Sequence, residues 1–436
     1  MSLLPAGAEP DLLNQLGVFE GTVGLTEASM AYLDVTAGRY KVLDTVQELG
    51  RDLAVPRLTP SLVKQVLEFH MALATELDRA LRSPQEGRAA DRMIAELPNL
   101  RASFNEFGRR GQSERQILLA SKLSPFVTWR SRPDISAWVG QSVRDAKRMD
   151  TEGFCEAVVV ACWEGYVAHD TDAVLAMVDG AVAACPPEYL HQAAELITMA
   201  GHALADAGQM EQARERLLQS LTMAEETDNG YGAVMARGAL TLYGALTPEM
   251  PSGLAQTAER ARADAAQLGV PSLLSWVWFA SGVLHLRDGI NKNALAALEE
   301  SLALAEESGA KIVEASARRT WTAISPGLGA DEVLASHLRT FARMREGGHD
   351  RQSLSMLPWM VQPLLELGRH RQVLLVERLL RRFGRGGRVH QAPGYAEGVR
   401  QAIAALGPVA DTLLTRPVSS LSQGLDDLVA QLASGG

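Results

Sequence analysis

The chain has 436 residues, about three times the ~150 residues of an average domain, so it has room for several domains or for one long repeat array. Apolar residues make up 47% and charged residues 22%, which is typical of a chain that folds around a core and excludes general disorder. The net charge of −10 argues against bulk attraction to nucleic acid or to an anionic membrane. An odd number of cysteines in a long chain favours a reducing compartment, and we predict the cytoplasm.

Neither a signal peptide nor a membrane span is expected. The first residues lack the basic and apolar segments of a signal peptide. The longest apolar run, residues 273–286, is shorter than the ~20 residues that cross a bilayer. We therefore expect this run to be a buried helix, and we expect no membrane contact.

The first 150 residues predict mainly helices. Short amphipathic helices are expected over residues 11–19 and 25–33, then a brief strand over 39–43 that runs into a helix ending near Leu53. Pro56 and Pro60 separate this part from a helix over 61–81, whose apolar residues keep a helical period. Further helices are expected over 88–107, 113–129 and 134–149.

An internal repeat dominates the rest of the chain. Residues 201–226 and 282–307 align without a gap at an offset of 81, and the small residues match: Gly201 with Gly282, and Ala213 with Ala294. Half of this offset predicts a helical hairpin unit of ~40 residues, with Gly and Pro at the corners. Five or six such units cover residues 151 to about 387. Because one hairpin cannot bury its own apolar face, neighbouring units must stack and leave a concave surface.

The expected fold is all-α: an α-solenoid of TPR-like helical hairpin repeats with an N-terminal winged-helix-like or helical segment. We divide the chain into a winged-helix-like remnant (1–55), a helical linker bundle (56–150), TPR-like superhelical repeats (151–390) and a C-terminal helical cap (391–436). Helices are expected in the cap over 395–406 and 424–432, with a loop over 417–424.

Three stretches carry a resemblance to a known family. They are LLNQLGVFEGTVGLTEASMAY at 12–32, RYKVLDTVQELGRDL at 39–53 and ELPNLRASFNEFGRRGQSERQILLASKL at 96–123. The first two resemble the winged-helix segment of AfsR-type and LuxR-type regulators, which have a signal-transduction (STAND) ATPase core. The third resembles the junction of that segment with superhelical repeats. The resemblance implies a role in signal transduction or transcription regulation. The phosphate-binding loop G-x-x-x-x-G-K-[ST] of the ATPase core is missing, since the sequence has no Gly-Lys pair. We therefore expect the sensor part of such a regulator without its ATPase core.

No catalytic or metal signature is found. Cys155 and Cys162 have no His or Cys at the close spacing of a structural zinc site, so buried apolar cysteines are expected. Asp170, beside His169, is expected to cap a helix. The sequence has no G-x-S-x-G turn, and its histidines are scattered. We predict a protein that is not an enzyme and that uses no cofactor and no metal.

The concave face offers candidate binding residues. If the first helix of each unit lines the concavity, aromatic and histidine side chains gather there, a composition that suits ligand and peptide grooves. The alternative is that these side chains belong to the core, and we assign Trp278 to the core. The candidates for ligand or partner binding are His202, Trp276, Phe279, Trp163, Tyr243 and Trp321.

One basic segment stands out from the acidic background. It suits phosphate or carboxylate groups, but a solvated helix face is the favoured interpretation. Its members are Arg369, Arg371, Arg378, Arg381, Arg382, Arg385 and Arg388.

The sequence therefore favours a regulatory scaffold or sensor that binds a peptide, a protein partner or a small-molecule inducer on the concave face. The alternative is a DNA-binding transcriptional regulator that uses the winged-helix remnant and the basic segment. Binding to nucleic acid is possible under this alternative but is not favoured.

Overall fold

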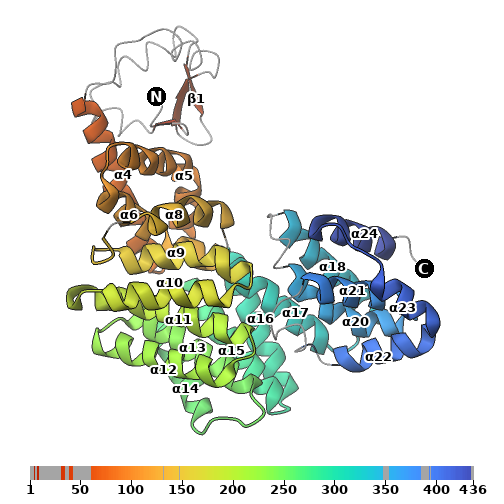
Figure 1. Cartoon of the computed structure of the whole chain (residues 1–436). Coiled ribbons are helices and arrows are strands. Elements are labelled where there is room, and N and C mark those ends of the chain that lie inside the picture. Colours follow the sequence, from red (N-terminus) through yellow and green to blue (C-terminus); the bar gives the residue numbers. More distant parts are fainter. Residues whose placement is uncertain are drawn as a thin grey trace.

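The fold is all-α apart from one small hairpin (Figure 1). The computed structural model describes residues 4, 7, 8, 31–34, 39–42, 60–130, 132–146, 148–346, 353–383, 392 and 394–433. The helices predicted over 11–19 and up to Leu53 lie outside these residues. Within the described ranges, none of the helices combines the length and the apolar character that crossing a bilayer requires.

Strands β1 (Ala31–Asp34) and β2 (Arg39–Val42) pair antiparallel, with Ala31 opposite Val42. The predicted strand at 39–43 is confirmed, whereas the end of the helix predicted over 25–33 is wrong, because residues 31–33 belong to β1. The hairpin is attached to the helices below it by a buried ion pair between Arg39 and Glu96. Beside that pair, Asn99 Nδ2 donates to the Gly7 carbonyl over 3.1 Å.

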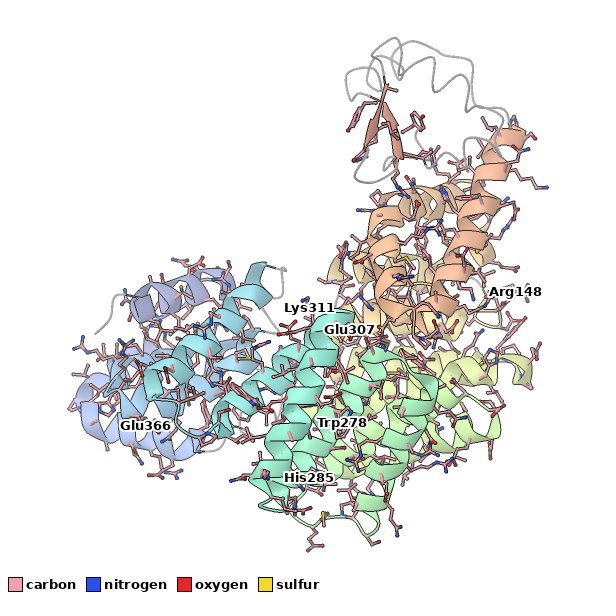
Figure 2. All side chains as sticks on the ribbon, turned by 180° about the vertical axis from the view of Figure 1, so that it is seen from behind. Arg148, Trp278, His285, Glu307, Lys311 and Glu366 are labelled. Atoms are coloured by element: carbon pink, nitrogen blue, oxygen red, sulfur yellow. The ribbon has the colours of Figure 1, made fainter. Side chains whose placement is uncertain are left out.

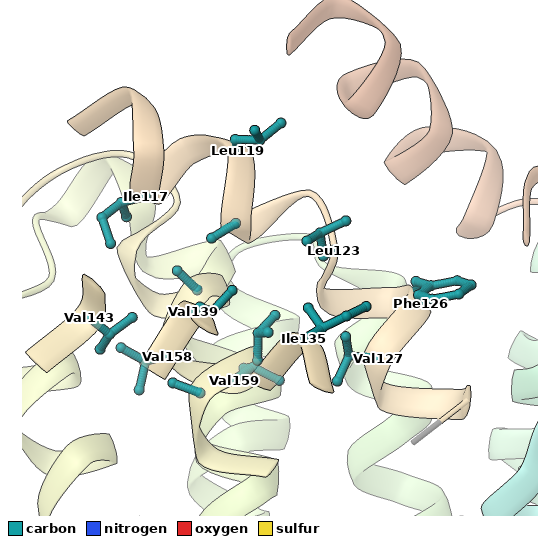
Figure 3. Packing of buried hydrophobic residues seen from close by; sticks show 14 of the residues in the cluster. Ile117, Leu119, Leu123, Phe126, Val127, Ile135, Val139, Val143, Val158 and Val159 are labelled. Atoms are coloured by element: carbon teal, nitrogen blue, oxygen red, sulfur yellow. The ribbon is translucent and has the colours of Figure 1, made fainter. Parts of the chain in front are cut away.

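Five helices follow: α4 (Pro60–Leu81), α5 (Glu86–Arg109), α6 (Ser113–Ser121), α7 (Ser124–Arg130) and α8 (Pro133–Arg144). The single helix predicted over 113–129 is wrong, since the chain turns between α6 and α7. Pro125 lies in the first turn of α7, where its missing N–H costs no hydrogen bond. Apolar side chains of α6, α7 and α8 pack with those of the next helix into one core (Figure 3).

Helical pairs then succeed one another. They are α9 (Phe154–Val167) with α10 (Thr171–Ala184), α11 (Leu190–Asp206) with α12 (Met210–Glu226), α13 (Gly230–Leu246) with α14 (Leu254–Leu268), α15 (Pro271–Arg287) with α16 (Asn291–Ser308), and α17 (Lys311–Ile324) with α18 (Ala330–Glu346). A short 3-10 helix, η1 (Pro187–Tyr189), precedes α11. Helices α11, α13, α15 and α17 begin 40 or 41 residues apart, as the repeat predicts.

The two helices of a pair differ in burial. Helices α11, α13 and α15 are buried on almost every side, and the apolar run at 273–286 is confirmed as part of such a helix. Helix α12 instead buries one stripe, Ala213, Leu217, Ser220 and Ala224, at helical spacing. The first helix of a pair therefore lies inside, and the second covers it from outside.

The 81-residue offset marks equivalent packing. A Cβ placed on Gly201 would lie 2.6 Å from Leu217 Cδ2, and one on Gly282 would lie 2.9 Å from Leu298 Cγ. Ser220 Oγ donates to the carbonyl of residue 194 over 2.7 Å, and Ser301 Oγ donates to that of residue 275 over 2.8 Å. Every partner shifts by the same 81 positions, so the prediction from the small residues is confirmed.

The C-terminal helices share a separate core. They are the 3-10 helix η2 (Leu354–Met356), α20 (Leu357–Glu366), α21 (His370–Phe383), α22 (Tyr395–Leu406), α23 (Pro408–Thr415) and α24 (Leu421–Ala433). The loop predicted over 417–424 is partly wrong, because α24 begins at Leu421. The segment boundaries at residues 55, 150 and 390 stay predictions.

Candidate functional site

A cavity of about 230 Å³ lies between the inner helices. Its walls come from α7, α9, α11, α13, α15 and α17, together with one residue of α20, while the outer helices α10, α12, α14 and α16 contribute none of its lining residues. The first helices of the pairs therefore line this cavity, and that it lies on the concave face of a superhelix stays a prediction. The volume exceeds the ~150 Å³ of an apolar protein cavity that holds benzene.

Most of the predicted binding residues meet in this cavity. Five of the six candidates line it: Trp163, His202, Tyr243, Trp276 and Phe279. They come from α9, α11, α13 and α15, so side chains far apart in the sequence form one aromatic wall. The sixth, Trp321, lies elsewhere, since its Nε1 donates to Glu299 Oε1 on the outer helix α16 over 3.1 Å.

The aromatic side chains contact one another across neighbouring units. His202 Nδ1 lies 2.8 Å from the Tyr243 hydroxyl, and the His202 ring meets the Trp276 ring edge-on at 5.7 Å between centroids. Trp276 Nε1 donates to the Met235 carbonyl over 3.4 Å. His202 and Tyr243, like Met235 and Trp276, are 41 residues apart, which is one repeat unit. The wall thus combines two different sets of equivalent positions, one with His202 and Tyr243 and one with Met235 and Trp276.

A glycine makes room for this wall. A Cβ on Gly238 of α13 would collide with the indole ring of Trp276. Gly238 therefore lets the indole lie directly against the backbone of the neighbouring helix. Glycine costs a helix about 1 kcal/mol relative to alanine, and here the close approach is its physical reason. A glycine inside a helix, such as Gly238, is therefore the signal in the sequence that a neighbouring side chain packs against the backbone there.

Trp278 corrects another prediction. We assign it to the core, but it is only half-buried and is not among the lining residues of the cavity. The guanidinium of Arg262 lies over its ring, 5.2 Å from the centroid. Figure 2 labels Trp278 on the ribbon. Trp276 and Phe279 instead occupy the buried side of α15. The assignment of Trp278 failed because α15 is apolar nearly all round, so its sequence does not mark the side that stays partly exposed.

A buried charge cluster supports the wall at Glu195, which lines the cavity. Arg82, directly after the end of α4, reaches Glu195 Oε1 over 2.5 Å, Glu156 Oε1 over 3.2 Å and Asp78 Oδ1 over 3.2 Å. Burial of the carboxyl, with Asp78 and Glu195 nearby, raises the pKa of Glu156 to about 7, although Arg82 opposes this shift. The guanidinium of Arg82 thus forms ion pairs with three carboxyl groups. Glu195, which lines the cavity, is one of them.

The N-terminal helices close one side of the cavity, which the sequence did not predict. Thr128 and Trp129 of α7 line it, and Trp129 Nε1 donates to the Tyr231 hydroxyl over 2.6 Å. At another side, Arg319 of α17 lies 5.0 Å from the ring centroid of Trp359 of α20. No repeat pattern could have revealed these residues, because they lie on helices of different units or outside the repeats.

The predicted basic segment does not form one exposed surface over its described part. Arg371, Arg381 and Arg382 are exposed, but Arg378 is buried in the C-terminal core, where burial lowers the pKa of its guanidinium. Arg369 donates to the Leu432 carbonyl and Arg381 pairs with Glu377. Arg385 and Arg388 lie outside the described residues. The described arginines of this segment therefore differ in burial and partners, and Arg378 is not available at the surface.

The structure also places the cysteines and the predicted cap. Cys155 and Cys162 are buried, as expected, and burial raises the pKa of the Cys162 thiol to about 12. The Asp170 side chain caps α10 by accepting from Ala173 N over 3.2 Å, which confirms its predicted role. Among the described residues, no group of His, Cys, Asp and Glu side chains is arranged to hold a metal ion.

Comparison with models of known protein families gives no match, and comparison with curated proteins gives no significant relative.

Proposed function

We propose that this protein is a non-enzymatic regulatory sensor that binds a small, mainly apolar inducer in the cavity between its inner helices. The observation that carries the proposal is the aromatic wall formed by His202, Tyr243, Trp276 and Phe279 around about 230 Å³ of space. Ligand sites are concave, mainly apolar and lined by aromatic side chains with a few polar groups. The limited volume favours a small molecule over a peptide or a protein partner.

We further propose that the inner and outer helices form a superhelix of TPR-like repeats. The matched surroundings of Gly201 and Gly282, and the matched hydrogen bonds of Ser220 and Ser301, support this interpretation. In such an array each unit contacts its neighbours, and a ligand in the concavity touches several units at once. Binding would therefore bias how the units stack.

The role in signal transduction or transcription regulation rests on the resemblance to AfsR-type and LuxR-type regulators. The β1–β2 hairpin agrees with the wing of a winged helix, which we propose for the N-terminal segment. The DNA-binding alternative has less support, because the burial of Arg378 divides the predicted basic segment.

Filling the cavity tests the proposed site. Val283 lines it from α15, so Val283→Phe is expected to abolish binding of naphthalene in a calorimetric titration, while the wild-type protein binds this probe. Val409→Phe is the matched control, because Val409 is exposed on α23. Failure of the wild-type protein to bind, or equal binding by Val283→Phe, would contradict the proposal. A titration with ATP is expected to show no heat of binding, and tight binding of ATP would overturn the sensor interpretation.

A further inference from the structure

Two buried polar side chains beside the cavity have no hydrogen-bond partner among the described residues. They are the Nε1–H group of Trp163 on α9 and the hydroxyl of Thr128 on α7. Trp163 is 7% exposed and Thr128 is 8% exposed, and both line the cavity. The other indoles of the wall are satisfied, since Trp129 donates to Tyr231 and Trp276 donates to Met235.

An unpaired buried donor is unusual, because most buried polar groups in native proteins find a partner. An indole nitrogen can only donate, so Trp163 requires an acceptor. Trp163 and Thr128 both line the cavity, while their polar atoms have almost no accessible surface as long as the cavity is empty. A bound molecule can therefore supply the missing acceptor when these side chains turn toward it, with the indole as an obligate donor and the hydroxyl as a donor or acceptor.

The charged side chains that line the cavity, Glu195 and Arg319, are both engaged within the protein, which favours an uncharged ligand. The guanidinium of Arg319 lies over the Trp359 ring, 5.0 Å from its centroid. The carboxylate of Glu195 is neutralised by Arg82 at 2.5 Å, so the wall presents no unpaired acid at this position that a cationic ligand would satisfy. Transfer of a charged group from water into an apolar site where it has no partner costs a large desolvation free energy. The ring systems of Trp276 and Phe279, with centroids 6.2 Å apart, offer aromatic surface for a flat apolar body.

We infer that the cavity binds a neutral, flat, mainly hydrophobic molecule of about two fused rings that carries one hydrogen-bond acceptor, that Trp163 Nε1 donates to this acceptor, and that the Thr128 hydroxyl is a second polar contact for the same molecule. This inference rests on the proposed function, and it adds the chemical class of the inducer and the residue that selects it.

Two probes of equal shape test the inference. Quinoline and naphthalene differ in one ring atom, and only quinoline has an acceptor. The acceptor of free quinoline is hydrated, and losing this water weakens quinoline binding by the same factor in every variant. We therefore compare the ratio of the naphthalene Kd to the quinoline Kd between variants, because this common factor cancels. Trp163→Phe keeps an aromatic ring and removes the donor, and it is expected to lower this ratio by about tenfold. Trp278→Phe, an equal exchange outside the cavity, is expected to leave the ratio unchanged.

The second variant is Thr128→Val, which keeps the shape of the side chain and removes the hydroxyl. It is expected to lower the same ratio by a smaller factor, and it keeps the inference testable if Trp163→Phe does not fold. If Trp163→Phe and Thr128→Val both fold and both leave the ratio unchanged, the inference is overturned and the proposed function stands. Tighter binding of 2-naphthoate than of quinoline would overturn the claim of a neutral ligand. If neither naphthalene nor quinoline binds the wild-type protein, the proposed function fails and the inference fails with it.

Discussion

Glu86 caps α15 through Ser272, a residue 186 positions further along the chain. Its carboxylate accepts from Ser272 N over 2.8 Å and from Ser272 Oγ over 2.5 Å, at the first turn of α15. The same carboxylate pairs with Arg130 at 3.1 Å, and Arg130 also donates to the Ser308 carbonyl at the end of α16 over 2.5 Å. A negative group at a helix N-terminus is favourable, since it meets the unpaired N–H groups there. This contact joins the N-terminal helices to α15 and α16, next to the cavity.

Glu86→Gln is expected to lower the free energy of unfolding by about 3 kcal/mol, because it leaves the buried guanidinium of Arg130 without its counter-charge. Urea denaturation followed by circular dichroism measures the effect. The control is Glu114→Gln, since Glu114 forms an exposed ion pair with Arg148 and no measurable change is expected. Equal stability of the two variants would show that the Glu86 contact does not hold these helices together.

Gly201→Ala and Gly282→Ala are expected to lower the free energy of unfolding by similar amounts, about 1–3 kcal/mol each. In both, the new methyl group meets a buried leucine of the outer helix, Leu217 or Leu298. Gly180→Ala is the control, because Gly180 is exposed on α10 and a Cβ there meets nothing within 4 Å. That substitution is expected to raise stability by up to about 1 kcal/mol. Thermal or urea unfolding compares the three, and strongly unequal losses at the two inner glycines would contradict equivalent packing.

Gly238→Ala is expected to disturb the cavity rather than the whole fold. Its methyl group would displace the indole of Trp276, so binding of naphthalene should weaken on the order of tenfold, or ~1.4 kcal/mol. Calorimetric titration measures the Kd, and circular dichroism checks that the helices persist. Gly180→Ala again serves as the control and should bind naphthalene like the wild type. Unchanged binding by a folded Gly238→Ala would mean that the position of Trp276 does not shape the site.

Glu156 gives stability a defined dependence on pH. Its pKa is about 7 in the folded protein against 4.5 for an ordinary glutamate, so between these values the folded state holds a proton that the unfolded chain releases. The contribution of Glu156 to stability is therefore lost as the pH rises from 4.5 to 7. Glu156→Gln stays uncharged, so its stability relative to the wild type should rise across this window, by an amount on the order of 3 kcal/mol.

Urea denaturation at pH 5 and at pH 8 measures the difference for Glu156→Gln. Glu152→Gln is the control, since Glu152 is an exposed glutamate near the start of the same helix, and this variant should follow the wild-type curve. A constant difference between Glu156→Gln and the wild type at the two pH values would rule out titration of Glu156 in this range.

The amino-acid sequence by itself determined the helical content, the limits of some helices such as those over 61–81 and 395–406, and the 81-residue equivalence. These features depend on local signals: apolar residues at helical spacing, Gly and Pro at corners, and small residues where helices approach. The same signals predicted five cavity residues, because equivalent positions of successive units must face the same side. Trp163, His202 and Tyr243 follow this pattern from one inner helix to the next.

Only the tertiary structure decided that Trp278 stays partly exposed and what closes the cavity. Helix α15 is apolar nearly all round, so the sequence placed Trp276 and Phe279 on the cavity side but wrongly gave Trp278 to the core. Thr128 and the pairing of Arg82 with Glu195 depend on contacts between helices far apart in the chain, and such contacts leave no periodic trace. The physical reason is that repeat spacing constrains neighbours along the array, whereas the closure of the site is set by long-range packing and by the need to pair buried charges.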